Sequence, residues 1–147
     1  QYLEAVTFVA ESQDYDVLGH ITYPLKAICE QTGRIPDMRK YEKQFRRIFE
    51  AVIKRGKGIE VNTSGLRCRL GSLLPDRELL KWYRACGGTN ITVGSDAHRP
   101  QDVGEGIAAA TADLYAIGYR ELTTYIYREP IRREIVETST AGAGDKN

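Results

Sequence analysis

Short apolar segments alternate with longer amphipathic segments along this chain, and no other feature constrains its fold as strongly. Four segments are short, apolar or β-branched, and followed by polar residues, glycine or proline, which is typical of strands. Helical periodicity occurs before, between and after them. The predicted strands cover residues 17–21, 58–62, 90–94 and 122–127, and the predicted helices about residues 3–10, 41–53, 76–83, 102–117 and 131–136. This order predicts an α/β fold in which helices connect four parallel strands.

The spacing of the predicted strands limits the size of the sheet. They begin about 30 to 40 residues apart, and a closed barrel of eight such units needs about 250 residues. With 147 residues, the chain is expected to form either an open α/β sheet or the C-terminal portion of a barrel. Residues 138–147 are small and polar, so we predict a disordered tail there and a folded domain over residues 1–137.

Local signals predict where individual helices begin and end. Asp76 follows a proline and can cap the helix after it, and Gly56 closes the helix before the second predicted strand. The helix predicted to begin near residue 102 carries apolar residues along one face. These residues are Val103, Ile107, Leu114 and Ile117.

The charge balance argues against two classes of partner. The chain has 21 Lys and Arg residues and 20 Asp and Glu residues, a net charge of +1. This balance provides no electrostatic attraction to a nucleic acid or a membrane surface, and the apolar runs are too short to span a bilayer. We therefore predict no nucleic-acid and no membrane partner. Cys29, Cys68 and Cys86 are widely spaced and odd in number, which favours the reducing cytoplasm over a disulfide framework.

His20 and His98 are the only histidines of the chain, and both lie near the ends of predicted strands. Catalytic groups of parallel α/β folds lie at the C-terminal ends of strands. Asp96 and His98 are two residues apart, so in an extended chain they project to one side and can bind a divalent metal. The alternative is an aspartate that caps a helix and a surface histidine. Because both histidines fall on the same predicted face, we favour metal ligation by His20, Asp96 and His98.

The second predicted strand carries further polar candidates. Glu60, Asn62 and Ser64 alternate, so they are expected to point the same way. A glutamate within a buried strand is costly unless it is paired, and it could be either a structural ion-pair partner or a functional group. Arg67 follows a Ser-Gly turn and could bind a phosphate through two hydrogen bonds, or it could be a surface arginine of the loop.

Several of these segments together resemble one family. The matching segments are residues 16–21 (DVLGHI), 58–67 (GIEVNTSGLR), 75–78 (PDRE) and 91–104 (ITVGSDAHRPQDVG). The set, over about residues 3–127, resembles the PHP (polymerase and histidinol phosphatase) superfamily and is most similar to its histidinol-phosphatase branch.

This resemblance implies a fold, a cofactor and a reaction. The fold would be a distorted seven-stranded (β/α) barrel, of which this chain would form the C-terminal half. Two or three divalent metal ions (zinc, manganese or iron) would bind at its C-terminal face, where His20, Asp96 and His98 match family metal ligands. The activity would be hydrolysis of a phosphate monoester, typically L-histidinol phosphate in histidine biosynthesis, with a small phosphorylated substrate and phosphate as product. Asp96 and His98 would be catalytic, Arg67 would contact the phosphate, and Glu60 would point into the barrel.

The chain departs from the family pattern in one important respect. The family's first ligands form an H-x-H pair near the N-terminus, and this chain begins at Gln1 within a predicted helix and contains no such pair. We therefore expect an N-terminal half to be missing and the chain alone to have little or no activity. Thr22 stands where family members often have aspartate. The alternative hypothesis is a non-catalytic α/β module that forms a homodimer or complements a separate N-terminal half through exposed sheet edges.

Overall fold

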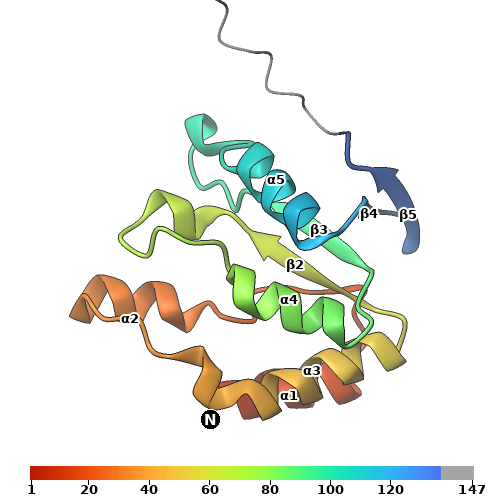
Figure 1. The fold of residues 1–147 in the computed structure, drawn as a ribbon, viewed down its shortest axis with the longest axis horizontal. Helices are drawn as coiled ribbons and strands as arrows, with labels where there is room; N and C mark the ends of the chain where they lie inside the picture. The colour runs from red at the N-terminus through yellow and green to blue at the C-terminus, as the bar shows by residue number, and fades with distance from the viewer. Residues whose placement is uncertain (137–147) are drawn as a thin grey trace, which may run out of the picture.

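The computed structural model describes residues 1–136, so the predicted disordered tail lies outside the described residues. Its centre is a parallel sheet with the strand order β1-β2-β3, of which Figure 1 labels β2 and β3. The strands are β1 (Val17–Leu18), β2 (Gly58–Asn62) and β3 (Ile91–Gly94). Three of the four predicted parallel strands are therefore confirmed, although the first is shorter than expected.

The fourth strand is not part of this sheet, and the prediction of four parallel strands is wrong. β4 (Glu121–Ile126) pairs antiparallel with β5 (Glu129–Glu134) in a separate two-stranded sheet, so the helix predicted at 131–136 is wrong as well. Tyr127 and Arg128 form the two-residue turn, with φ of 50° and 68°. Two positive φ angles are typical of the tight hairpin turns that match strand twist. Neither residue is glycine or asparagine, so the usual sequence signal for this turn was absent.

β4 nevertheless approaches β3 through side chains. The backbone N–H of Ile91 donates a hydrogen bond to Oγ1 of the buried Thr123 at 3.3 Å. Arg132 of β5 also reaches across, donating to the carbonyl oxygen of Thr89 at 2.7 Å. The Thr123 hydroxyl therefore accepts a hydrogen bond from the β3 backbone, in the place of the backbone carbonyl that a fourth parallel strand would provide.

Five α-helices complete the described fold, and four of them were predicted. They are α1 (Tyr2–Ser12), α2 (Pro24–Thr32), α3 (Glu42–Lys54), α4 (Arg77–Ala85) and α5 (Ile107–Ile117). Short 3-10 turns occur at Met38–Tyr41, Ser64–Arg67 and Pro100–Asp102. α2 was not predicted, although proline at its first position and Gly33 just after its end are signals that favour a helix there. None of the helices within residues 1–136 is long and apolar enough to cross a membrane.

A side-chain cap explains where α4 begins, and two glycines explain where α5 begins. The Asp76 side chain accepts a hydrogen bond from the backbone N–H of Leu79 at 3.0 Å, which confirms the predicted cap of α4. α5 begins at Ile107 rather than near residue 102. Gly104 and Gly106 both have φ of 78°, which interrupts the helical path and leaves Val103 73% exposed instead of on a buried face.

The core lies between the sheet and helices α1, α3, α4 and α5, which contact one another in that order (Figure 1). Ile59 and Val61 of β2 are fully buried against it. Because side chains alternate along a strand, Glu60 and Asn62 belong to the other face of the sheet. The core therefore directs the polar residues of β2 away from the helices.

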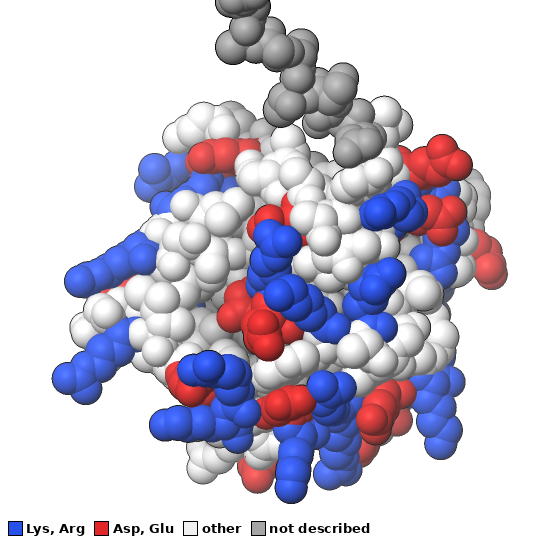
Figure 2. All heavy atoms as spheres, viewed as in Figure 1, with Lys and Arg blue, Asp and Glu red and all other residues white. Residues whose placement is uncertain are grey.

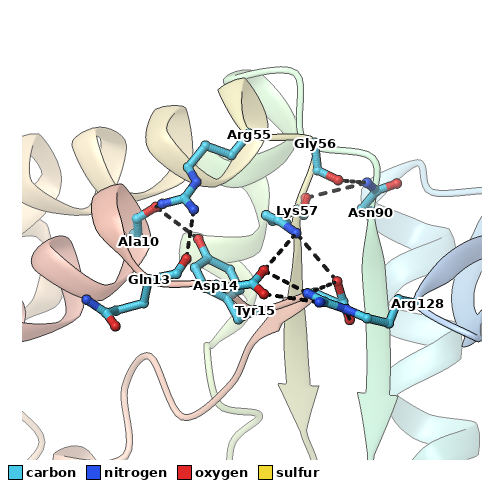
Figure 3. Close-up of polar contacts among 10 residues, drawn as sticks. Ala10, Gln13, Asp14, Tyr15, Arg55, Gly56, Lys57, Asn90 and Arg128 are labelled. Atoms are coloured by element: carbon cyan, nitrogen blue, oxygen red, sulfur yellow. Dashed lines mark hydrogen bonds and ion pairs between the residues drawn. The ribbon is translucent and has the colours of Figure 1, made fainter.

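Charged residues join the N-terminal ends of the strands to the hairpin (Figure 3). Arg128, in the hairpin turn, donates hydrogen bonds to Asp14 at 2.7 Å and to Asp16 at 2.9 Å. Lys57, which precedes β2, lies 3.4 Å from Asp16. These contacts connect segments more than a hundred residues apart and hold the hairpin against the entry to β1.

We expect Arg128→Met to be less stable than the parent chain at neutral pH, because two carboxylates lose their partner. Hydrogen bonds from Arg128 hold the pKa of Asp14 and of Asp16 below the usual value. A carboxyl group with a lowered pKa stabilises the fold while it is ionised, so the stability difference should be full above about pH 5 and shrink below about pH 4. Urea unfolding at pH 7 and pH 3 measures this. Arg39→Met is the control, since Arg39 pairs with Asp37 only two residues away; a difference that persists unchanged at pH 3 would contradict the prediction.

The surface agrees with the charge balance of the sequence. Figure 2 shows basic and acidic side chains interspersed over the face seen in Figure 1. Several of the basic residues are paired, as Arg47 with Glu11 at 2.8 Å and Arg77 with Asp113 at 3.0 Å. On this face, mixed charge gives little attraction to a large polyanion.

Candidate functional site

The C-terminal ends of the three parallel strands meet at one edge of the sheet, and every predicted site residue follows one of them. Pairing of Leu18 with Ile59 and of Asn62 with Gly94 aligns the strands in register. The segments that leave this edge carry His20 after β1, Arg67 after β2, and Asp96 and His98 after β3. The ion pairs of Arg128 with Asp14 and Asp16 lie at the opposite edge, where the strands begin. This separation is the usual one in parallel α/β folds, where function gathers at the C-terminal ends of strands.

Asp96 and His98 lie side by side. His98 Nε2 is 3.4 Å from Asp96 Oδ1, and the two side chains are 82% and 20% exposed, respectively. The imidazole therefore faces solvent, whereas the carboxylate is mostly enclosed. Two residues of the preceding strand end, Asn62 and Ser64, hydrogen-bond to the Asp96 side chain.

The surroundings of Asp96 favour its ionised form. Partial burial raises the pKa of this carboxyl, but hydrogen bonds from Asn62 and Ser64, together with the charges of His20 and His98, bring the pKa below its usual value. Asp96 is therefore a carboxylate at neutral pH. An anionic oxygen beside two imidazoles is a suitable donor for a divalent cation.

Glu60 forms a second pair with His20, and its role was left open by the sequence. His20 Nε2 lies 4.0 Å from Glu60 Oε2. That oxygen is buried and has no hydrogen-bond partner within the described residues, and no lysine or arginine of residues 1–136 forms an ion pair with it. The structural interpretation, a glutamate paired with a buried basic residue, does not describe this arrangement. A buried carboxylate oxygen without a donor suits a site that receives a cation.

Two glycines make room for the Glu60 carboxylate. A Cβ at Gly94 would lie 2.8 Å from Glu60 Oε1, and a Cβ at Gly19 would lie 3.2 Å from Oε2. Both glycines therefore permit a close approach of backbone to the carboxylate. The sequence analysis missed this role, because the glycines belong to neighbouring strand ends and meet Glu60 only in the folded sheet.

Two of the predicted ligands occupy an uncommon backbone conformation. His20 has φ of 57° and Asp96 has φ of 49°. The other described non-glycine residues with positive φ are the two in the hairpin turn. Such a conformation costs of order 1 kcal/mol or more and is concentrated at functional sites. At His20 and Asp96 the positive φ changes the direction of the backbone directly after β1 and β3, at the shared edge of the sheet.

Arg67 is enclosed, which argues against a surface arginine of the loop. Its side chain is 16% exposed, and Nη2 donates hydrogen bonds to the carbonyl oxygens of Ser95 at 2.7 Å and of Asp96 at 3.3 Å. Nε lies 3.8 Å from Glu105 Oε2. Nη1 is buried without a hydrogen-bond partner among the described residues. Arg67 therefore holds the loop that carries Asp96 and retains one free donor.

The side chains at this edge are of types that bind divalent metals, but too few of them lie together to hold one ion. Imidazole nitrogens and carboxylate oxygens are ordinary ligands for zinc, manganese and iron. They occur as two pairs, His20 with Glu60 and Asp96 with His98. Within residues 1–136, no three His, Cys, Asp or Glu side chains are arranged to hold one ion. Further ligands, from protein or water, would be needed to complete a coordination shell.

Comparison with known proteins identifies relatives of this chain. No family model matches it. A protein of Thermotoga maritima named probable histidinol-phosphatase is 31% identical over 121 residues, which cover 82% of this chain and 49% of the relative. A protein of the same name from Deinococcus radiodurans is 28% identical over 122 residues, covering 83% and 44%. The chain thus spans about half the length of the curated relatives it matches.

Solved structures show the same likeness in three dimensions. The HisK protein of Listeria monocytogenes superimposes with a TM-score of 0.64 at 27% identity, covering 74% of this chain and 42% of that one. The histidinol phosphate phosphatase HisK of Lactococcus lactis superimposes with a TM-score of 0.71 at 21% identity, covering 88% and 49%. The resemblance predicted from the sequence motifs is confirmed for the part of the relatives that the chain covers.

Proposed function

We propose that this chain, a relative of the histidinol-phosphatase branch of the PHP superfamily, supplies part of the active site of a metal-dependent phosphatase. The observation that carries the proposal is the convergence of His20, Asp96 and the donor-free Glu60 oxygen at one sheet edge. The Lactococcus lactis relative was crystallised with zinc, L-histidinol and phosphate, which supports the same chemistry here.

The first role of these residues is to bind metal. His20, Asp96 and His98 would hold divalent metal, with Glu60 beside His20. When bound, the metal would lower the pKa of a coordinated water and offset phosphate charge. The hydrogen bonds from Asn62 and Ser64 keep the Asp96 carboxylate oriented, as supporting groups commonly do for ligands.

The substrate would be a small phosphate monoester, with L-histidinol phosphate as the candidate and histidine biosynthesis as the setting. Arg67 Nη1, buried and without a partner, is the donor that would meet a phosphate oxygen. A guanidinium is suited to this because it keeps its charge and its donors have fixed directions. Asp96 and His98 would touch the reacting phosphate or its attacking water, from the loop that Arg67 holds.

The complete site would need more chain than is present here. Catalytic zinc sites commonly have three protein ligands, whereas the described residues offer two pairs. We propose that the three parallel strands form part of a distorted (β/α)7 barrel and that an N-terminal half supplies the remaining ligands. The chain alone would then bind metal weakly and have little or no phosphatase activity.

The test is the metal content of this chain and of His98→Ala after equilibration with zinc, manganese or iron. We expect metal in the parent chain and at least about tenfold weaker metal binding in the variant, since a lost ligand is costly. Asp102→Asn is a matched control, because this acid lies in the same loop region outside the donor pairs. Elemental analysis measures the metal content, and a competition titration measures the metal affinity.

An absence of metal in both proteins would count against the proposal. It would favour the alternative, a non-catalytic α/β module that dimerises or complements a separate half. The observation that supports this alternative is that residues 1–136 contain no group of three potential metal ligands. Sedimentation analysis of the parent chain would then show whether a homodimer forms.

A further inference from the structure

Two tyrosines that the sequence analysis did not consider contact His20, one of the proposed metal ligands. The ring of Tyr23 stacks on the His20 imidazole, with the ring centroids 5.4 Å apart and the ring planes 14° from parallel. The hydroxyl of Tyr2 donates a hydrogen bond to the backbone carbonyl oxygen of His20. One contact therefore reaches the side chain of His20, and the other reaches its backbone.

Hydrogen bonds and packing hold the backbone of His20 in its uncommon conformation. Its φ is 57°, and a residue other than glycine keeps such an angle only where its surroundings hold it. The His20 carbonyl oxygen accepts two hydrogen bonds, from the Tyr2 hydroxyl and from the backbone N–H of Tyr23 at 3.0 Å. The next residue, Ile21, is 1% exposed and belongs to the core. The backbone at His20 is therefore fixed from α1, from the start of α2 and from the core.

The Tyr23 ring leaves the metal-binding edge of the imidazole free. Stacked rings cover each other's faces, whereas the ring nitrogens of histidine lie at the edge of the imidazole. His20 Nε2 lies 4.0 Å from Glu60 Oε2, so this edge is turned toward the buried carboxylate oxygen. His98, by contrast, is 82% exposed, and no aromatic ring of residues 1–136 stacks on it.

Helix capping does not explain a tyrosine at position 23. Tyr23 is the N-cap residue of α2 and makes no side-chain cap hydrogen bond, whereas Ser, Thr, Asp and Asn are the residues that stabilise a helix from this position. Its side chain adds little to the core, because Tyr23 is 49% exposed. The aromatic contact that Tyr23 makes is the one with His20.

We infer that Tyr2 and Tyr23 are positioning residues that hold His20, with its Nε2 toward Glu60, before a metal ion binds. This inference rests on the proposed function and adds how one of its ligands is oriented. Tyr2 fixes the backbone at His20, and Tyr23 restricts the rotation of the imidazole. A ligand whose rotation is already restricted loses less conformational entropy on binding, so the metal is bound more tightly.

The first measurement uses the metal-free chain, because the inference concerns His20 before metal binds. The chain has two histidines and so gives two sets of imidazole proton resonances, which His98→Ala assigns. We expect nuclear Overhauser cross-peaks between the ring protons of His20 and Tyr23. Tyr23→Leu should shift the ring resonances of His20 and leave those of His98 unchanged. An absence of the cross-peaks in the parent chain would overturn the inference.

The second measurement is zinc affinity, from a competition titration of the parent chain and its variants. We expect affinity at least about tenfold weaker in Tyr23→Leu, and roughly two- to tenfold weaker in Tyr2→Phe, which removes only the hydroxyl. The conservative variant Tyr23→Phe keeps the ring and should restore the affinity that Tyr23→Leu loses. Tyr41→Leu is the matched control, because Tyr41 is exposed to a similar extent, 43%, and does not stack on His20.

The two measurements distinguish failure of this inference from failure of the proposed function. Equal zinc affinity in the parent and in Tyr23→Leu would overturn the inference, whereas a loss of affinity in His98→Ala would still support the metal site. A parent chain that binds no zinc would count against the proposed function. In that case the metal-free spectra decide, and His20 resonances that do not respond to Tyr23→Leu would overturn the inference as well.

Discussion

Phe49→Ala is expected to lower the free energy of unfolding by about 3–5 kcal/mol. Phe49 is fully buried, and its ring centroid lies 5.3 Å from that of Tyr83 and 6.2 Å from that of Phe45. Removing the ring leaves a cavity in the core and removes the aromatic contact between α3 and α4. Urea or thermal unfolding followed by circular dichroism measures the change. Because small domains are stable by only about 5–15 kcal/mol, this single substitution removes a large part of the total.

Two substitutions control for this result. Phe8 is also a helical phenylalanine but is 61% exposed, so Phe8→Ala should change stability by no more than about 0.5 kcal/mol. Phe49→Leu keeps most of the buried volume and should cost less than about 1.5 kcal/mol. Equal losses for Phe8→Ala and Phe49→Ala would mean that the core is not arranged as described.

Gly65→Ala is expected to destabilise the chain by about 3 kcal/mol and to disturb the site. A Cβ at this position would overlap the carbonyl oxygen of Ser72 and come within 3.2 Å of Leu74 Cγ. Backbone cannot yield as a flexible side chain can, so the turn itself has to move. That turn carries Ser64 and Arg67, and its movement should shift the amide resonances of both residues and of Asp96.

Gly71→Ala is the matched control in the same loop. A Cβ at Gly71 meets nothing within 4 Å, and the substitution should cost only about 1 kcal/mol for its positive φ of 62°. Its effect on the resonances of the Asp96 loop should be small. A Gly65→Ala variant as stable as Gly71→Ala, with unchanged resonances at Asp96, would show that the turn is not packed as tightly as described.

Features that depend on local pattern were predictable from the amino-acid sequence. Period-two and period-3.6 hydrophobicity located β2, β3 and α3, and Asp76 located the start of α4, because side-chain alternation, helical faces and capping act within a few residues. The edge at which His20, Asp96 and His98 gather was also predictable, since parallel strands necessarily place their C-terminal ends together. The family motifs added the expected chemistry to those positions.

Features that depend on contacts between distant segments became visible only in the folded chain. Tyr127 and Arg128 adopt positive φ, although neither is a residue type that favours this conformation. Hydrogen bonds to Asp14 and Asp16, near the N-terminus, hold the Arg128 side chain in place. Glu60 is accommodated by glycines of two neighbouring strand ends.

Lys26 illustrates the same limit beside the site. Its ammonium group donates a hydrogen bond to Ser64 Oγ at 3.3 Å, and this contact joins α2 to the turn that follows β2. Periodicity reports which face of an element is buried, but it carries no information about which element comes to lie on that face. Packing of distant segments determines that choice, and with it which charges remain unpaired and available to bind a ligand.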